Sequence, residues 1–187
     1  MGVLILGLAV LIGIHLVPAA PSLRQWLVQR LGEASYKAIF ALIALTGLGL
    51  IIVGMGQAPY VPVWQPPPWG KGLAVMLPVP AFILLVAAYL PGNVHRFTPH
   101  PMLWGVVLWS VGHLFANGDA ASILLFGALG LYSLFAIWSA NRRGAAKASG
   151  RLRLERDIAV VAVGLLLYFS FAYLHPIFFG VPAVQGL

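Results

Sequence analysis

Histidine is the residue type in this sequence that could carry chemistry at membrane depth. The chain has five histidines and only four acidic residues, and His15 and His113 lie inside apolar stretches. An ionisable side chain in such a stretch is costly and usually faces a partner. Two imidazoles on different helices, with no carboxylate nearby, fit the arrangement that holds haem iron. The alternative is that each histidine only forms a hydrogen bond with a neighbouring helix.

The residues around His113 bear on this choice. Gly105, Trp109, Gly112 and Ala116 share one helical face with His113. Small residues beside an imidazole leave room for a flat macrocycle, which predicts that Gly112 contacts a cofactor. The same glycines could instead bring two helices close together.

Other polar residues could support such a cofactor. His100 follows Pro99 at the start of a helix, where it is either a surface residue or a hydrogen-bond partner of a cofactor carboxylate. His175 is expected at the membrane interface and is the best substitute for His15 as a ligand. Haem propionates favour cations near an interface, and four basic residues are candidates on the side of His15: Arg24, Arg30, Lys37 and Arg96.

Composition places the chain in a membrane. Hydrophobic residues make up 61% of the 187 residues and charged residues only 8%, far below the quarter typical of soluble domains. We therefore expect one integral-membrane domain over residues 1–187. The net charge of +7 comes from basic residues scattered through short loops, which indicates topology and contact with anionic lipid rather than nucleic acid. The absence of cysteine excludes disulfides and thiolate chemistry.

Hydropathy predicts an all-α polytopic bundle with about six transmembrane helices. A span needs about 20 apolar residues, and the fourth stretch is shorter than that. The first stretch has no basic residue before Arg24, which argues against a signal peptide. The predicted spans cover residues 1–17, 37–56, 72–90, 101–116, 120–140 and 157–178.

The basic residues predict the orientation of these spans. Ten of the eleven lie in or beside the odd-numbered links, and only Lys71 lies in an even-numbered one. The positive-inside rule makes the odd-numbered links cytoplasmic. Both termini are then on the non-cytoplasmic side.

The sequences of two links and the positions of several glycines predict further local features. The second link, "APYVPVWQPPPWG", contains five prolines and should be extended, as an interfacial anchor or as a lid over a cavity. The fifth link, "NRRGAAKASGRLRLERD", is expected to be a basic loop that faces lipid or, alternatively, an acidic partner. Glycines in the second and fifth spans predict close helix packing or room beside a flat ligand.

Two segments resemble the NnrU family, which includes bacterial proteins linked to nitrogen-oxide metabolism and the plant 15-cis-zeta-carotene isomerase. They are "HLVPAAPSLRQWLVQRLGEASYKAIFALIAL" and "HPMLWGVVLWSVGHLFANGD". The resemblance runs from His15 to about Arg143 and implies a multi-pass protein of the bacterial inner membrane. It also implies haem b held by His15 and His113, with His100 at the family's His-Pro step. The isomerase has a cysteine three residues before the second histidine, where this chain has Ser110. A change of iron ligand to a thiolate is therefore excluded.

Three functions follow from these observations. The first is a haem b protein of nitrite or NO metabolism, acting by binding, by redox chemistry or in support of a reductase partner. The second is a haem-dependent cis–trans isomerase of an apolar polyene such as zeta-carotene. The third is a non-catalytic assembly factor whose histidines only pack. Whether the protein is an enzyme or forms a homo-oligomer is left open by the sequence.

Overall fold

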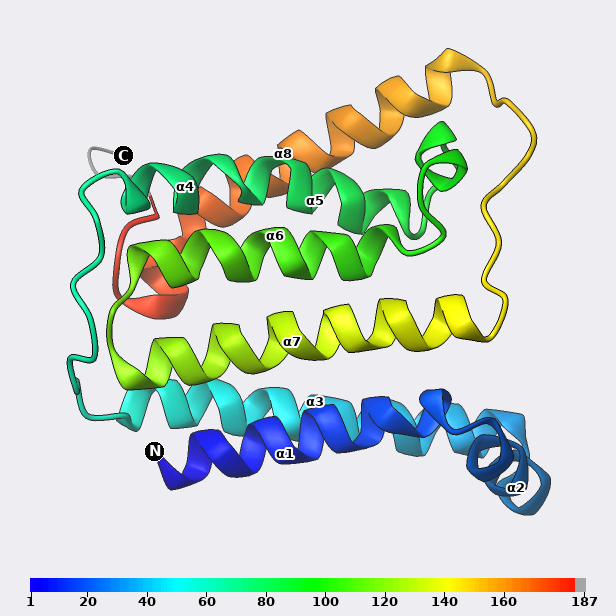
Figure 1. Ribbon diagram of the computed structural model, residues 1–187, viewed down its shortest axis with the longest axis horizontal. Coiled ribbons are helices and arrows are strands. Elements are labelled where there is room, and N and C mark those ends of the chain that lie inside the picture. Colours follow the sequence, from blue (N-terminus) through cyan, green and yellow to red (C-terminus); the bar gives the residue numbers. More distant parts are fainter. Residues whose placement is uncertain (184–187) are drawn as a thin grey trace.

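The computed structural model describes residues 1–183, and these residues fold into helices joined by short links (Figure 1). In chain order the elements are α1 (Gly2–Leu16), the 3-10 turn η1 (Val17–Ala19), α2 (Pro21–Leu31), α3 (Glu33–Gln57), α4 (Gly70–Met76), α5 (Pro78–Ala87), the 3-10 turn η2 (Asn93–Arg96), α6 (Pro101–Ala116), α7 (Ala120–Arg142) and α8 (Leu154–Phe179).

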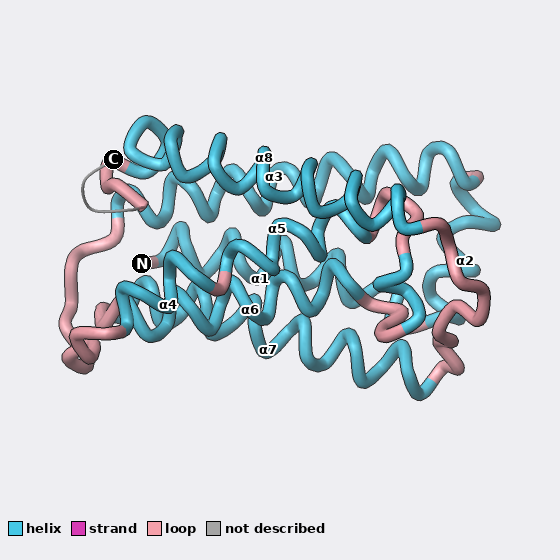
Figure 2. Tube along the Cα trace, turned by 90° about the horizontal axis from the view of Figure 1, so that it is seen from above, coloured by secondary structure: helices cyan, strands magenta, loops and turns pink. Residues whose placement is uncertain are grey.

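The predicted membrane helix bundle is confirmed. Five segments are long and apolar enough to cross a membrane, namely α1 with η1, α3, α4 with α5, α7 and α8, and α6 is a shorter apolar helix. These helices run along the long axis of the molecule, and the loops gather at its two ends (Figures 1 and 2). Large apolar side chains such as Leu42 and Leu166 are well exposed, as expected where lipid is the solvent.

Two local features differ from the sequence expectation. The link after the first span contains an additional helix, α2, which Figure 1 shows end-on across the bundle. The third span is broken at Leu77 into α4 and α5. Pro78 and Pro80 lack the backbone N–H groups that would continue the helix through this point.

Glycines bring α1 and α3 together, which is one of the two roles predicted for the glycines of the second span. A Cβ added at Gly7 would lie 2.7 Å from the backbone nitrogen of Ile51, and one at Gly47 would lie 2.8 Å from that of Leu11. The two backbones therefore touch with no side chain between them. Helix α7 completes this part of the core, where Leu125 and Phe126 join the buried side chains of α1 and α3.

The basic residues lie at one end of the bundle. Helix α2, turn η2 and the link between α7 and α8 share this end, while the N-terminus, the α3–α4 link and the end of α8 share the other (Figure 1). Among the described residues 1–183, the opposite end has a single Lys or Arg, which is Lys71 at the start of α4. We call the first the basic end, and the positive-inside rule predicts that it faces the cytoplasm.

The long links are fastened to neighbouring turns. The proline-rich link is non-helical, as predicted, and lies along the α6–α7 turn, where the backbone nitrogen of Val63 donates to Gly118 O (2.8 Å) and that of Ala120 donates to Val61 O (2.9 Å). At the basic end, the side chain of Asn93 exchanges two hydrogen bonds with the backbone of Leu152. The α7–α8 link is therefore held against η2.

Candidate cofactor-binding site

His15 lies near the basic end of α1, where three helices meet. Its Nδ1 is 2.8 Å from the carbonyl oxygen of Leu11, one turn earlier. Its ring packs edge-on against Phe40 of α3 and Tyr132 of α7, with centroids 5.0 and 6.1 Å away. The Tyr132 hydroxyl donates to the backbone carbonyl of His15 (3.0 Å). This bond satisfies a carbonyl in the last turn of α1, where helical partners run out.

His113 lies near the other end of the bundle, in the last turn of α6. Its Nδ1 is 2.8 Å from the carbonyl oxygen of Trp109. Its ring packs against Phe126 of α7 (4.6 Å between centroids) and against Trp109 (5.1 Å). The backbone and side-chain nitrogens of Asn117 both donate to the His113 carbonyl.

The two histidines are fixed by the same kind of hydrogen bond. A carbonyl oxygen only accepts, so Nδ1 carries the proton in both rings and Nε2 keeps its lone pair. Histidines that bind metals usually donate the other ring N–H to a carbonyl or carboxylate. His15 and His113 thus each keep Nε2 free of the proton, and an imidazole nitrogen of this kind is a ligand type that holds haem iron.

The structure places both rings against α7, though at different levels. Tyr132 and Phe126 are six residues apart, which is about 9 Å along a helix axis at 1.5 Å per residue. His15 is therefore displaced toward the basic end, as the sequence predicted. Each ring has its own aromatic neighbours, and each contacts a different residue of α7.

Helix packing accounts for the small residues around His113. A Cβ at Gly112 would lie 3.0 Å from the Leu73 carbonyl oxygen of α4, and one at Gly105 would lie 2.9 Å from that of Ala81 in α5. Ser110 is buried against Gly130 of α7. Contacts of Gly112 and Ser110 with a cofactor stay predictions.

The other predicted site residues lie toward the basic end. The Nε2 atom of His100 is 2.9 Å from the Asn141 side-chain oxygen. The Arg24 guanidinium lies over the ring of Tyr36, and Arg30 lies over Trp26 within α2. Lys37 forms an exposed ion pair with Glu33, and Arg96 ends η2. A role for these cations toward haem propionates stays a prediction.

His175 is the alternative ligand, and it lies near the same end of the bundle as His113. Its Nδ1 donates to the Val181 carbonyl (2.7 Å), and its ring packs against Phe179 of the same helix (4.7 Å). Its Nε2 therefore also keeps a lone pair that could bind a metal.

The sequence reasoning missed the side chains of α3 and α7 that position these rings. Phe40, Phe126 and Tyr132 lie in strongly apolar spans, where their residue types are ordinary. The one available signal was the hydroxyl of Tyr132, because a buried tyrosine O–H usually finds a partner.

Comparison with known proteins identifies one family. The model of that family, NnrU, described as NnrU protein, matches residues 3–183, nearly the whole chain. No curated protein and no solved structure matches the chain. Among residues 1–183, no group of three or more His, Asp or Glu side chains is placed to hold a metal ion.

Proposed function

The chain belongs to the NnrU family, and from this premise we propose that it is an integral-membrane haem b protein whose iron is held between His15 and His113. The observation that carries the proposal is the shared hydrogen bond from Nδ1 to the carbonyl four residues earlier, 2.8 Å long in both histidines. It fixes the tautomer and leaves Nε2 as the iron ligand.

The surroundings of the two rings support this assignment. Among residues 1–183, neither imidazole is hydrogen-bonded to or ion-paired with a carboxylate, and aromatic side chains contact both rings. Haem in such a site would supply one-electron chemistry and an iron centre that binds nitric oxide. The residues of the chain would hold the rings in place and exclude water.

Substitution of each histidine tests the ligands. The protein is purified from haem-sufficient cells, and its Soret absorption and electron paramagnetic resonance spectrum are compared with those of His15→Ala, His113→Ala and His175→Ala. We expect the first two variants to lose haem or to change from low-spin to high-spin iron. His175→Ala is the matched control and should keep the native spectrum. Added imidazole should restore low-spin iron in the first two, which separates loss of a ligand from loss of folding.

Two results would overturn this proposal. Colourless, iron-free protein from haem-sufficient cells would leave only a non-catalytic assembly factor. A low-spin spectrum that survives in His15→Ala and is lost in His175→Ala would move the ligand pair to His113 and His175.

The biological role proposed for this haem is in nitrogen-oxide metabolism, as a binding or redox protein. Spectra of the dithionite-reduced protein with and without NO test it, and we expect NO to displace one imidazole. Conversion of zeta-carotene isomers by the reconstituted protein would instead support the isomerase. Ser110 supplies no thiolate for that activity.

A further inference from the structure

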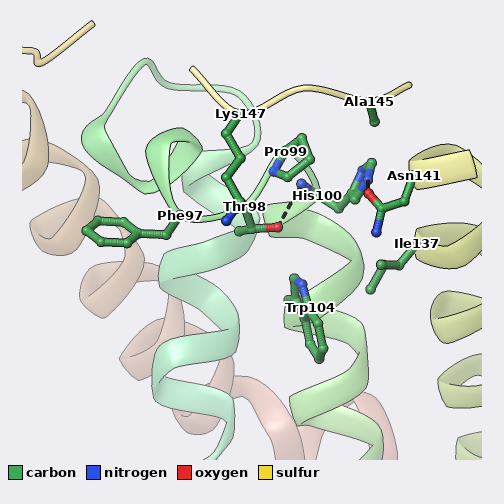
Figure 3. Close-up of a pocket in the computed structure, with 9 residues that line it drawn as sticks. All are labelled: Phe97, Thr98, Pro99, His100, Trp104, Ile137, Asn141, Ala145 and Lys147. Atoms are coloured by element: carbon green, nitrogen blue, oxygen red, sulfur yellow. Dashed lines mark hydrogen bonds between the residues drawn. The ribbon is translucent and has the colours of Figure 1, made fainter. Parts of the chain in front are cut away.

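The basic end carries a pocket that is separate from the two haem-ligand candidates. It lies between the start of α6, the end of α7 and the α7–α8 link (Figure 3). Its wall combines polar and apolar side chains: Thr98, His100, Trp104, Ile137, Asn141 and Lys147. We propose that this pocket binds the phosphate headgroup of an anionic phospholipid, with Lys147 as its cation.

Hydrogen bonds hold Lys147 at the pocket. The backbone nitrogen of the next residue, Ala148, donates to the His95 carbonyl of η2 (2.9 Å). Asn93 fixes the same link further along through Leu152, and its backbone and side-chain nitrogens also donate to Asp157 of α8. The link that carries the lysine is therefore a fixed wall of the pocket.

The polar side of the pocket suits an anion. Figure 3 shows Lys147 reaching from the link toward Thr98, while His100 and Asn141 face each other, and none of the nine residues drawn is acidic. The His100 ring donates to the Asn141 oxygen, which leaves the Asn141 NH2 group as a donor for a ligand. An ammonium and an amide donor together recognise phosphate oxygens.

The apolar side of the pocket favours a lipid over a soluble anion. Trp104 and Ile137 form its floor, and Leu134 lies one turn along α7 from Ile137 on the same face, with 44% of its surface exposed. An acyl chain could follow these residues from the basic end toward the middle of the bundle. The positive-inside rule predicts that the pocket is at the cytoplasmic headgroup level, where anionic lipids attract basic residues.

Native mass spectrometry of the full protein in detergent tests the headgroup site. Phosphatidylglycerol is titrated into the wild type, Lys147→Gln, Lys147→Arg and Arg151→Gln. Arg151 is the matched control because it is an exposed cation of the same link outside the pocket. We expect Lys147→Gln to weaken the first binding event about fivefold, the effect of one basic residue near an anionic surface. Lys147→Arg and Arg151→Gln should stay close to the wild type.

The location is tested with phosphatidylglycerol that carries brominated acyl chains. These chains should quench Trp104, measured as the difference in fluorescence between the wild type and Trp104→Phe. Equal losses in Lys147→Gln and Arg151→Gln would overturn the proposal, as would equal binding of phosphatidylcholine. Displacement of the lipid by inorganic phosphate at similar concentrations would assign the pocket to a soluble anion instead. None of these results depends on haem.

Discussion

The His15 and His113 regions use the same hydrogen bond in two different settings. In both, Nδ1 donates to the carbonyl four residues earlier. The His15 carbonyl accepts from a side chain of another helix, Tyr132, whereas the His113 carbonyl accepts from Asn117, just beyond the end of its own helix. Local geometry therefore sets which ring nitrogen faces outward, and tertiary contacts set where the ring lies.

The two regions also differ in what holds their helix ends. After His113 the chain turns at Asn117 and Gly118, against which the proline-rich link lies. After His15 the chain continues through η1, and Tyr132 is the contact from α7. The His113 region should therefore depend on the outer link, and the His15 carbonyl on the single hydroxyl of Tyr132.

The largest loss of stability in this comparison is expected from Gly118→Ala. A Cβ at this position would run into the carbonyl oxygen of Trp64 and would lie 2.8 Å from the Pro66 ring. We expect a loss of about 1–3 kcal/mol of stability, the usual cost of overpacking. We also expect the spectrum of haem iron ligated by His113 to change, because the displaced turn would move the His113 ring. Thermal unfolding in detergent measures the loss.

Gly127→Ala is the control for this substitution, because a Cβ there would meet nothing within 4 Å. It should stabilise α7 by about 0.5–1 kcal/mol, since glycine is unfavourable inside a helix. Equal melting temperatures for the two variants would show that the proline-rich link does not brace the His113 region.

A smaller effect, confined to the His15 region, is expected from Tyr132→Phe. The change removes the hydroxyl bond to the His15 carbonyl and keeps the aromatic contact. It should cost about 1 kcal/mol. Tyr168→Phe is the matched control, because its hydroxyl donates to the Val75 carbonyl at the same 3.0 Å. Both variants should lose similar stability, whereas only Tyr132→Phe should change the electron paramagnetic resonance spectrum of a haem ligated by His15.

Much of the fold could be predicted from hydropathy, because a bilayer forces apolar segments into helices. The fourth predicted span, residues 101–116, coincides with α6. Helix α2 was missed because it is short and polar enough to be taken for a link. The break at Leu77 was readable from Pro78 and Pro80, since proline removes the donors that a continuous helix needs.

The candidate site could be predicted only in part. His15 and His113 stand out by residue type in apolar helices, and their bonds to the preceding turn follow from the helix itself. Their neighbours Phe126 and Tyr132 depend on how α7 is rotated and shifted against the other helices. Residue types and hydropathy alone do not specify that register.

The smallest loss of stability is expected from Asn117→Ala. The His113 carbonyl would lose the side-chain donor at 2.8 Å and keep the Asn117 backbone donor at 3.0 Å. The carbonyl stays satisfied, so the cost should be about 0.5 kcal/mol, at the low end for a hydrogen bond. Thermal unfolding beside Tyr132→Phe measures the difference. Should Asn117→Ala cost as much as Tyr132→Phe, the contrast between a carbonyl with two donors and one that depends on a single hydroxyl would be wrong.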